Sequence, residues 1–258
     1  MRRLSAPYAV FAVLLMAGIA LPAATAAASA APVSALAVGP VGSIIPATAS
    51  NWAGYAAISS NHTVSKVSAT WVEPTVTCTS KDTYAVFWVG LDGATSPSVE
   101  QTGTFAICNG GVASYEAWWE IYPVNDIQPI SSITVHPGDS FTASVSYSKS
   151  TAKFSMKLTD TTTGATFTKA KAYASAWRAD AECIAERPAS SSGALLPLAN
   201  FGKVTFKSCD ATISGTTAGI GTFASVYQIN MATTSKTLAT TGALTSSKTF
   251  TVTWKASG

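Results

Sequence analysis

The chain has 258 residues, with 16 lysines and arginines, 13 aspartates and glutamates and two histidines, for a formal net charge of +3. Apart from Arg2 and Arg3, basic and acidic residues nearly balance, and no cluster of lysine and arginine occurs. This composition excludes nucleic acid as a partner, because binding a phosphate backbone needs clustered positive charge.

The N-terminus, residues 1–30, is predicted to be a secretory signal peptide. Two arginines precede an apolar stretch at residues 8–21, and small residues follow it. A basic start, an apolar run of roughly 7–15 residues and a small-residue exit are typical of such signals. Spanning a bilayer takes roughly 20 apolar residues, so the run is too short for an anchor. We therefore expect a secreted, extracellular protein with no membrane association once the signal is removed.

Residues 31–49 are small, uncharged and punctuated by proline and glycine. This composition indicates a linker or a short pro-segment rather than a packed element. The remaining residues, 50–258, are enough for one all-β domain of ordinary size.

The domain is predicted to consist of strands separated by turns. Several segments alternate in polarity or are rich in valine, threonine and aromatic residues, which is typical of strands. They are VSKVSATWVEP, YAVFWVGLDG, YEAWWEIYP, SSITVHPGDSFTASVSY, KFSMKLTDTTTGATFTKAKAY, KVTFKSC and KTFTVTWKA. Hairpin-like turns are expected at Pro137 and Gly164. The abundant serine and threonine suit solvated faces, so we expect an all-β fold, a jelly-roll-like β-sandwich of two antiparallel sheets.

The chain contains four cysteines, Cys78, Cys108, Cys183 and Cys209, and no C-x-x-C motif. An even number in an exported chain favours disulfides over a metal site or a reactive thiol. Four cysteines allow three pairings, and the sequence alone does not choose among them. We expect Cys78–Cys108 and Cys183–Cys209, because each pair joins sequence neighbours that flank strand-rich segments.

Several common kinds of catalytic site are excluded by the motifs. The two histidines, His62 and His136, are predicted to lie in an exposed loop and at a strand end, and H-E-x-x-H is absent. The G-x-S-x-G motif of nucleophile-elbow hydrolases is absent, as are D-T-G and D-S-G of pepsin-like peptidases. An enzyme with this sequence would use carboxylates or amides, and we expect no metal and no cofactor.

The YEAWWEIYP segment combines carboxylates with large aromatic residues. Period-two alternation places Glu116, Trp118, Glu120 and Tyr122 on one face of a strand. Each residue alone is compatible with a half-buried polar group satisfied by neighbouring strands. Together they favour a groove for an extended peptide or a sugar chain, because aromatic rings offer flat apolar contact and carboxylates fix orientation.

The AECIAE segment follows the same rule. Alternation places Glu182 and Glu186 on one face and Cys183 on the other. In the EQTGT segment, Gln101 faces the opposite way from Glu100.

Six stretches, taken in chain order, resemble the glutamic peptidases, the eqolisin family. They are NWAGY from Asn51, FWVGLDG, EQTGT, YEAWWEIYP, AECIAE and PLANFGKVTFKSC, so the likeness runs from about residue 50 to the C-terminus. The resemblance implies a β-sandwich that acts as an acid endopeptidase.

The resemblance also implies residue roles. The family's catalytic glutamine, in a Q-T-G segment, matches Gln101, and its catalytic glutamate, at the end of an A-E-x-x-x-E segment, matches Glu186. The substrate-binding and supporting residues that it implies are Trp52, Trp88, Asp92, Glu116 and Glu120.

A glutamate and a glutamine can together hydrolyse an amide. Glutamate takes a proton from water and later returns it to the leaving nitrogen, and its ordinary pKa of roughly 4.3 suits acid media. Glutamine can hold the water with its carbonyl oxygen and stabilise the oxyanion with its NH₂ group. We therefore expect polypeptide substrates, and a monomer.

Two other functions stay compatible with the sequence. One is a glycoside hydrolase on the same sandwich, with Glu120 and Glu186 flanking the glycosidic bond. The other is a non-catalytic module that binds carbohydrate or peptide through the aromatic face.

Overall fold

The computed structural model describes residues 43–258, which form strands and one short 3₁₀ turn. The predicted signal peptide, residues 1–30, lies outside the described residues. The elements are β1 (Ser43–Ala49), β2 (Trp52–Ile58), β3 (Val64–Val72), β4 (Thr83–Leu91), β5 (Val99–Asn109), β6 (Val112–Tyr122), β7 (Gln128–Pro129), β8 (Ser140–Ser148), β9 (Lys153–Asp160), β10 (Thr166–Ala172), β11 (Asp180–Glu186), β12 (Lys203–Ile213), β13 (Thr216–Gly219), η1 (Ile220–Thr222), β14 (Ser225–Ala232), β15 (Thr237–Thr241) and β16 (Phe250–Trp254). Over this part of the chain, no helix has the length and apolar character needed to cross a membrane.

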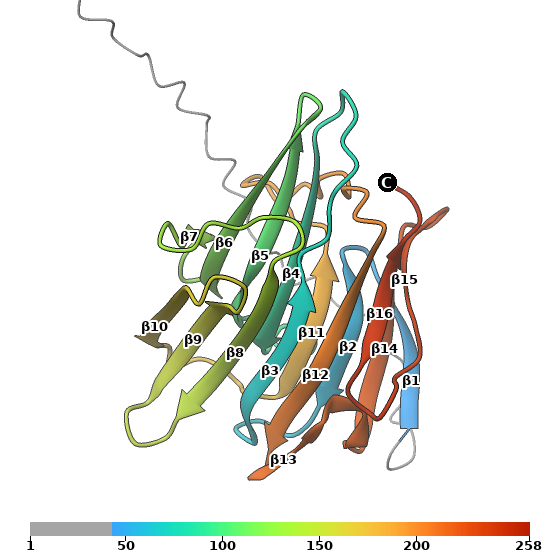
Figure 1. Cartoon of the computed structure of the whole chain (residues 1–258). Coiled ribbons are helices and arrows are strands. Elements are labelled where there is room, and N and C mark those ends of the chain that lie inside the picture. The colour runs from blue at the N-terminus through green and yellow to red at the C-terminus, as the bar shows by residue number, and fades with distance from the viewer. Residues whose placement is uncertain (1–42) are drawn as a thin grey trace, which may run out of the picture.

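The strands form two facing layers (Figure 1). The front layer has the order β10–β9–β8–β3–β12, and the back layer continues as β16–β15–β14–β2–β11–β4–β5–β6–β7. Strand β12 joins the layers, because residues 203–206 pair with β16 and residues 207–213 pair with β3, with a register shift between Lys207 and Asp210. All pairings along this path are antiparallel, which confirms the predicted all-β sandwich.

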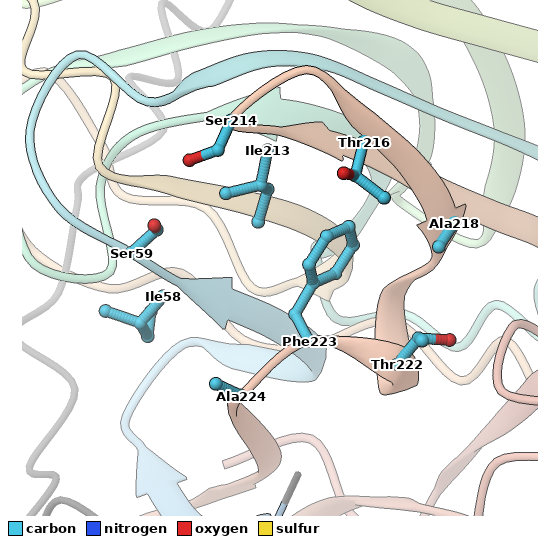
Figure 2. A pocket seen from close by; sticks show the side chains of 9 residues that line it. All are labelled: Ile58, Ser59, Ile213, Ser214, Thr216, Ala218, Thr222, Phe223 and Ala224. Atoms are coloured by element: carbon cyan, nitrogen blue, oxygen red, sulfur yellow. The ribbon is translucent and has the colours of Figure 1, made fainter. Parts of the chain in front are cut away.

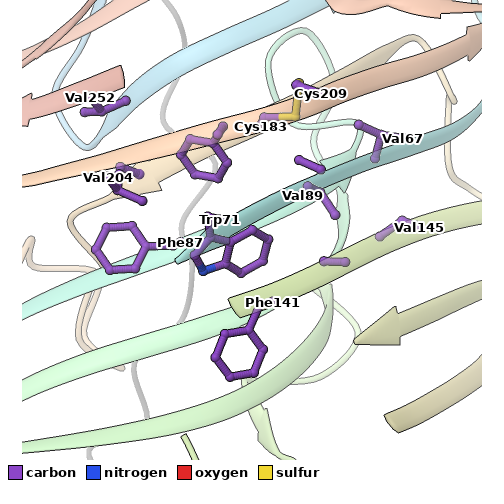
Figure 3. Packing of buried hydrophobic residues seen from close by; sticks show 14 of the residues in the cluster. Val67, Trp71, Phe87, Val89, Phe141, Val145, Cys183, Val204, Cys209 and Val252 are labelled. Carbon is purple, nitrogen blue, oxygen red and sulfur yellow. A yellow bond between two sulfur atoms is a disulfide. The ribbon is translucent and has the colours of Figure 1, made fainter. Parts of the chain in front are cut away.

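The main core lies between the layers and follows from period-two alternation. In β3, β8, β9 and β12, buried apolar residues alternate with more exposed polar ones. Trp71 lies at the centre, with its ring centroid 6.3 Å from that of Phe141 and 5.7 Å from that of Phe206 (Figure 3). Its indole N–H donates to Thr104 Oγ1 at 3.0 Å, so the buried polar group is satisfied.

The central strands of the back layer, β2, β11, β4 and β5, are buried along nearly their whole length. One face of these strands packs against the main core. The other face carries a second apolar cluster, here called the second cluster. Its buried members are Ala47, Ala49, Trp52, Ala56, Val86, Trp88, Ala94, Val99, Phe105, Trp118, Ile184 and Ile229.

Two disulfides connect these parts, and both have the expected pairing. Cys78 is bonded to Cys108, with Cα atoms 5.4 Å apart, and Cys183 is bonded to Cys209, with Cα atoms 6.4 Å apart. Cys183 faces the main core, opposite to its neighbours Glu182 and Glu186, as alternation predicts. The Cys183–Cys209 bond ties β11 of the back layer to β12 (Figure 3).

The end of the expected linker is different from the prediction. Residues 43–49 are not an irregular connection but form β1, which pairs in parallel with β14 from Ser43↔Ser225 to Ala49↔Met231. The segment packs because the alternate side chains of Ile45, Ala47 and Ala49 are buried against the back layer. Pro46 is tolerated because β1 pairs on one side only, where a residue without an N–H group need not break a ladder.

Candidate active site

The two residues that the resemblance identifies as catalytic lie on one face of the back layer. Gln101 on β5 lies opposite Gly90 on β4 and Glu120 on β6. Glu186 on β11 lies opposite Trp52 on β2. Because side chains alternate along a strand, Gln101, Glu120, Glu186 and Trp52 all share the face that carries the second cluster.

Both carboxyl oxygens of Glu186 accept a hydrogen bond from a neutral N–H group. Asn51 Nδ2 lies 3.1 Å from Oε1, and Trp88 Nε1 lies 2.8 Å from Oε2. The side chain is fully buried, and this burial raises the pKa of Glu186 to about 8 even though Trp88, Trp52 and Asn51 oppose the shift. The indole N–H of Trp52 also lowers the pKa of Glu186, although within residues 43–258 it forms no hydrogen bond. Glu186 is therefore protonated in the resting protein at acid pH.

Gln101 is oriented by a second buried carboxyl. Its Nε2 donates to Glu120 Oε2 at 2.7 Å, and both side chains are fully buried. Over residues 43–258, the carbonyl oxygen Oε1 of Gln101 has no hydrogen-bond partner. A buried acceptor in that state costs about 1–3 kcal/mol, so the site favours a ligand that donates to this oxygen.

Trp88 contacts Glu186 and also Gly90, the residue opposite Gln101. Its indole N–H donates to Glu186, and its six-membered ring covers Gly90, where a Cβ atom would lie 2.7 Å from Trp88 Cζ3. Any side chain at this glycine would displace the indole. Trp52 packs edge-on against Trp88, with ring centroids 5.0 Å apart. Among the described residues Gln101 and Glu186 share no hydrogen bond. On β4, Gln101 lies opposite Gly90 and Glu186 opposite Val86, with Trp88 between these two positions.

Asp92, an expected supporting acid, holds two loops together. It adopts a left-handed backbone conformation (φ 70°), and its carboxyl accepts the backbone N–H groups of Arg178 at 2.7 Å and Ala179 at 2.8 Å. Asp180 reciprocates by accepting the N–H of Ala94 at 2.9 Å. Burial, with a further contribution from the charge of Asp180, raises the pKa of Asp92 to about 6. These contacts fix the loop after β4 against the start of β11.

The two glutamates of the YEAWWEIYP segment have different surroundings. Glu120 is buried and bonded to Gln101. Glu116 lies on the exposed part of β6, and among residues 43–258 its carboxyl takes part in no hydrogen bond or ion pair. The structure therefore connects Glu120 to the candidate site and gives Glu116 no comparable contact.

Two further residues of the site received no role from the sequence. Asn51 directly precedes Trp52 in the N-W motif, but only its contact with Glu186 makes it part of the site. Alternation places Glu182 on the same face as Glu186, and the structure buries it completely. This burial, together with the charge of Asp180, raises the pKa of Glu182 well above its ordinary range.

A separate pocket lies where β2 ends beside the β12–β13 hairpin (Figure 2). Phe223 stands in this pocket among small and hydroxyl side chains. The lining residues are Ile58, Ser59, Ile213, Ser214, Thr216, Ala218, Thr222, Phe223 and Ala224. None of them is a carboxylate, an amide or a histidine, so the pocket lacks a group for proton transfer near neutral or acid pH.

The chain is similar to known proteins in sequence and in structure. Residues 50–254 match the Peptidase A4 family. Aspergillopepsin-2 of Aspergillus niger is 32% identical over 195 residues, covering 66% of this chain and 67% of that protein. The crystal structure of scytalido-glutamic peptidase with a transition state analog inhibitor matches with a TM-score of 0.69 and 28% identity, covering 80% of this chain and 98% of the other. Aspergilloglutamic peptidase from Aspergillus niger matches with a TM-score of 0.59 and 30% identity, covering 67% and 99%.

Proposed function

Since the chain belongs to the peptidase A4 family, we propose that it is an endopeptidase whose catalytic pair is Gln101 and Glu186. One observation carries the assignment of the pair: a buried glutamine and a buried glutamate share one face, each oriented by its own hydrogen bonds. The substrates are polypeptides, and the site needs no cofactor for the steps given below.

Gln101 binds the attacking water and stabilises the oxyanion. Its Oε1, which has no partner in the described part of the chain, accepts a hydrogen bond from the water. One Nε2 hydrogen is donated to Glu120, and the amide has a second that can be donated to the developing oxyanion. Loss of one such donor costs roughly 2.7–4 kcal/mol of transition-state stabilisation in other hydrolases.

Glu186 carries the proton between the water and the leaving nitrogen. As a carboxylic acid it delivers its proton to the scissile amide, and as the carboxylate so formed it accepts a proton from the attacking water. The ordinary pKa of glutamate is roughly 4.3, and burial raises the pKa of Glu186 well above it, to about 8. The form that donates a proton therefore predominates in acid and is lost as the pH rises through that value.

The glycoside-hydrolase alternative is not favoured by the geometry. Glu120 and Glu186 lie on β6 and β11, with β5 and β4 between them. Three strand spacings alone separate their backbones by roughly 14 Å across the sheet, and Glu120 is in register with Glu182, four residues from Glu186. Paired glycosidase carboxyls lie roughly 5–9.5 Å apart, and Glu120 is already engaged by Gln101. The binding-module alternative does not account for membership of a peptidase family.

We expect hydrolysis of an unfolded protein such as casein to be fast at acid pH and to fade as the pH rises toward 8. EDTA and serine- or thiol-directed reagents should leave the rate unchanged, because the proposed pair involves no metal, serine or thiol. Pepstatin should be weak, because it is directed at a pair of aspartates. A pH–rate profile with and without these inhibitors tests the proposal. Maximal activity at neutral pH, or its loss to EDTA, would contradict it, and so would cleavage of xylan or glucan in place of protein.

Replacing Trp88 with phenylalanine should lower kcat/KM by roughly 10- to 100-fold, because the variant keeps an aromatic ring but removes the N–H donor to Glu186. An alanine variant is less informative, since loss of a buried tryptophan alone costs about 3–5 kcal/mol of stability. The matched control is Trp254→Phe, which removes an indole N–H that has no partner among residues 43–258. Equal losses in the two variants would show that the Trp88 N–H has no special role.

We further propose that the chain is exported through the signal at residues 1–30 and acts outside the cell as a monomer. The two disulfides support an oxidising compartment. N-terminal sequencing of the secreted enzyme and its mass in solution test both statements.

A further inference from the structure

We infer that Asn51 is a positioning residue of the site, which directs the proton of Glu186 toward the substrate. This inference rests on the proposed function, because Asn51 acts only through Glu186. It is carried by the contact between Asn51 Nδ2 and Glu186 Oε1, 3.1 Å long and fully buried, between residues 135 positions apart in the sequence.

The backbone holds Asn51 in one place. Its carbonyl oxygen accepts the N–H of Arg187 at 2.8 Å, which continues the β2–β11 ladder one step beyond the pair Trp52↔Glu186. Asn51 and Glu186 therefore lie at the same end of two paired strands, and both are fully buried. A side chain this confined has little rotamer freedom to lose when it binds the carboxyl.

An amide is well suited to this position because it donates at every pH without adding charge. A lysine or arginine here would hold Glu186 ionised, whereas an amide favours the carboxylate only moderately. Since a carboxyl with its pKa raised to about 8 must exchange a proton during the reaction, a neutral donor leaves both protonation states accessible.

The two donors also decide where the proton of Glu186 can lie. Asn51 Nδ2 occupies one position on Oε1, and Trp88 Nε1 occupies one on Oε2. An N–H group cannot accept a hydrogen bond, so the carboxylic proton must occupy one of the remaining oxygen lone pairs. The donors on Glu186 thus direct its acidic proton away from Asn51 and Trp88, to the side left for the reacting amide.

Two substitutions test this role. Asn51→Ala should lower kcat by roughly 10- to 100-fold with KM changed less than about threefold, because it removes one hydrogen bond to a titrating group. It should also shift the decline of activity in the pH–rate profile, which Glu186 sets, to higher pH. The reason is that a donor favouring the carboxylate is lost, so the pKa of Glu186 rises. Asn51→Asp should resemble the wild type more closely at low pH, where a protonated aspartyl group can donate, and should lose activity as that group ionises.

Asn230→Ala is the control, because it removes a partly buried side-chain contact, Asn230 Oδ1 to the Thr241 N–H at 2.7 Å, away from Glu186. It should leave kcat and the pH at which activity declines unchanged even if the melting temperature falls. The inference would be overturned if Asn51→Ala kept the wild-type kcat and lost activity at the same pH as the wild type. It would also be overturned if the ratio of kcat between Asn51→Asp and Asn51→Ala did not change with pH. The proposed function fails separately, if Glu186→Gln remains active.

Discussion

Replacing Glu186 with glutamine is expected to lower kcat/KM on an unfolded-protein substrate by roughly 10²- to 10⁴-fold, the usual contribution of a general acid–base group. Glutamine is isosteric and can be accommodated in the buried position, but it cannot carry a proton. Glu73→Gln is the matched control, because burial also raises the pKa of Glu73 to about 8 and it lies at the end of β3, outside the candidate site. The control should keep wild-type activity.

Gln101→Glu is expected to be equally inactive for a different reason. It places a carboxyl 2.7 Å from Glu120, so the two groups would share a proton and the oxyanion donor would be lost. Rates for these variants should be read beside their melting temperatures at the assay pH. If folded Glu186→Gln keeps more than about a tenth of the wild-type kcat/KM, a loss under roughly 1.4 kcal/mol, the role assigned to Glu186 is wrong.

The second large effect is a loss of stability between about pH 4.5 and pH 8. Burial raises the pKa of five carboxyls, to about 8 for Glu73 and Glu186, to about 6 for Asp92, and well above the ordinary range for Glu100 and Glu182. In this pH window the folded protein holds protons that the unfolded chain has released. Because stability falls with pH wherever the folded state binds more protons, the free energy of unfolding should decrease throughout the window.

The free energy of unfolding falls by about 1.4 kcal/mol for each pH unit over which one group is protonated in the folded state and ionised in the unfolded state. A few such groups can remove several kcal/mol, a large part of the total stability of roughly 5–15 kcal/mol of an ordinary domain. We expect the melting temperature at pH 7.5 to be at least about 10 °C below that at pH 4. Urea titrations across this range, repeated with Glu73→Gln, check the cause, since the variant should lose stability less steeply. Constant stability from pH 4 to 8 would contradict the assigned burial of these carboxyls.

The sequence predicted the parts of the fold that depend on alternation. Cys183 faces the main core, opposite to Glu182 and Glu186, because a period of two determines facing in any strand.

Other features depend on which strands become neighbours, which no local pattern specifies. The contacts of Asn51 and Trp88 with Glu186 join residues 135 and 98 positions apart. The raised pKa of Glu186 follows from burial on both faces of the back layer, which alternation in β11 alone did not indicate. Strand β1 was missed because Pro46, Ala47 and Ala49 have low strand propensity and the segment is ordered through its pairing with β14.

The bond between Cys183 and Cys209 makes the pairing of the candidate catalytic strand chemically verifiable. A slip of β11 by one residue would turn Cys183 toward the second cluster and carry Glu182 and Glu186 into the main core. In such a misaligned molecule the two thiols could not meet, because bridging needs Cα atoms within about 7 Å. Molecules that contain the Cys183–Cys209 bond are therefore already selected for the correct alignment of β11, and mapping this bond in a preparation identifies them.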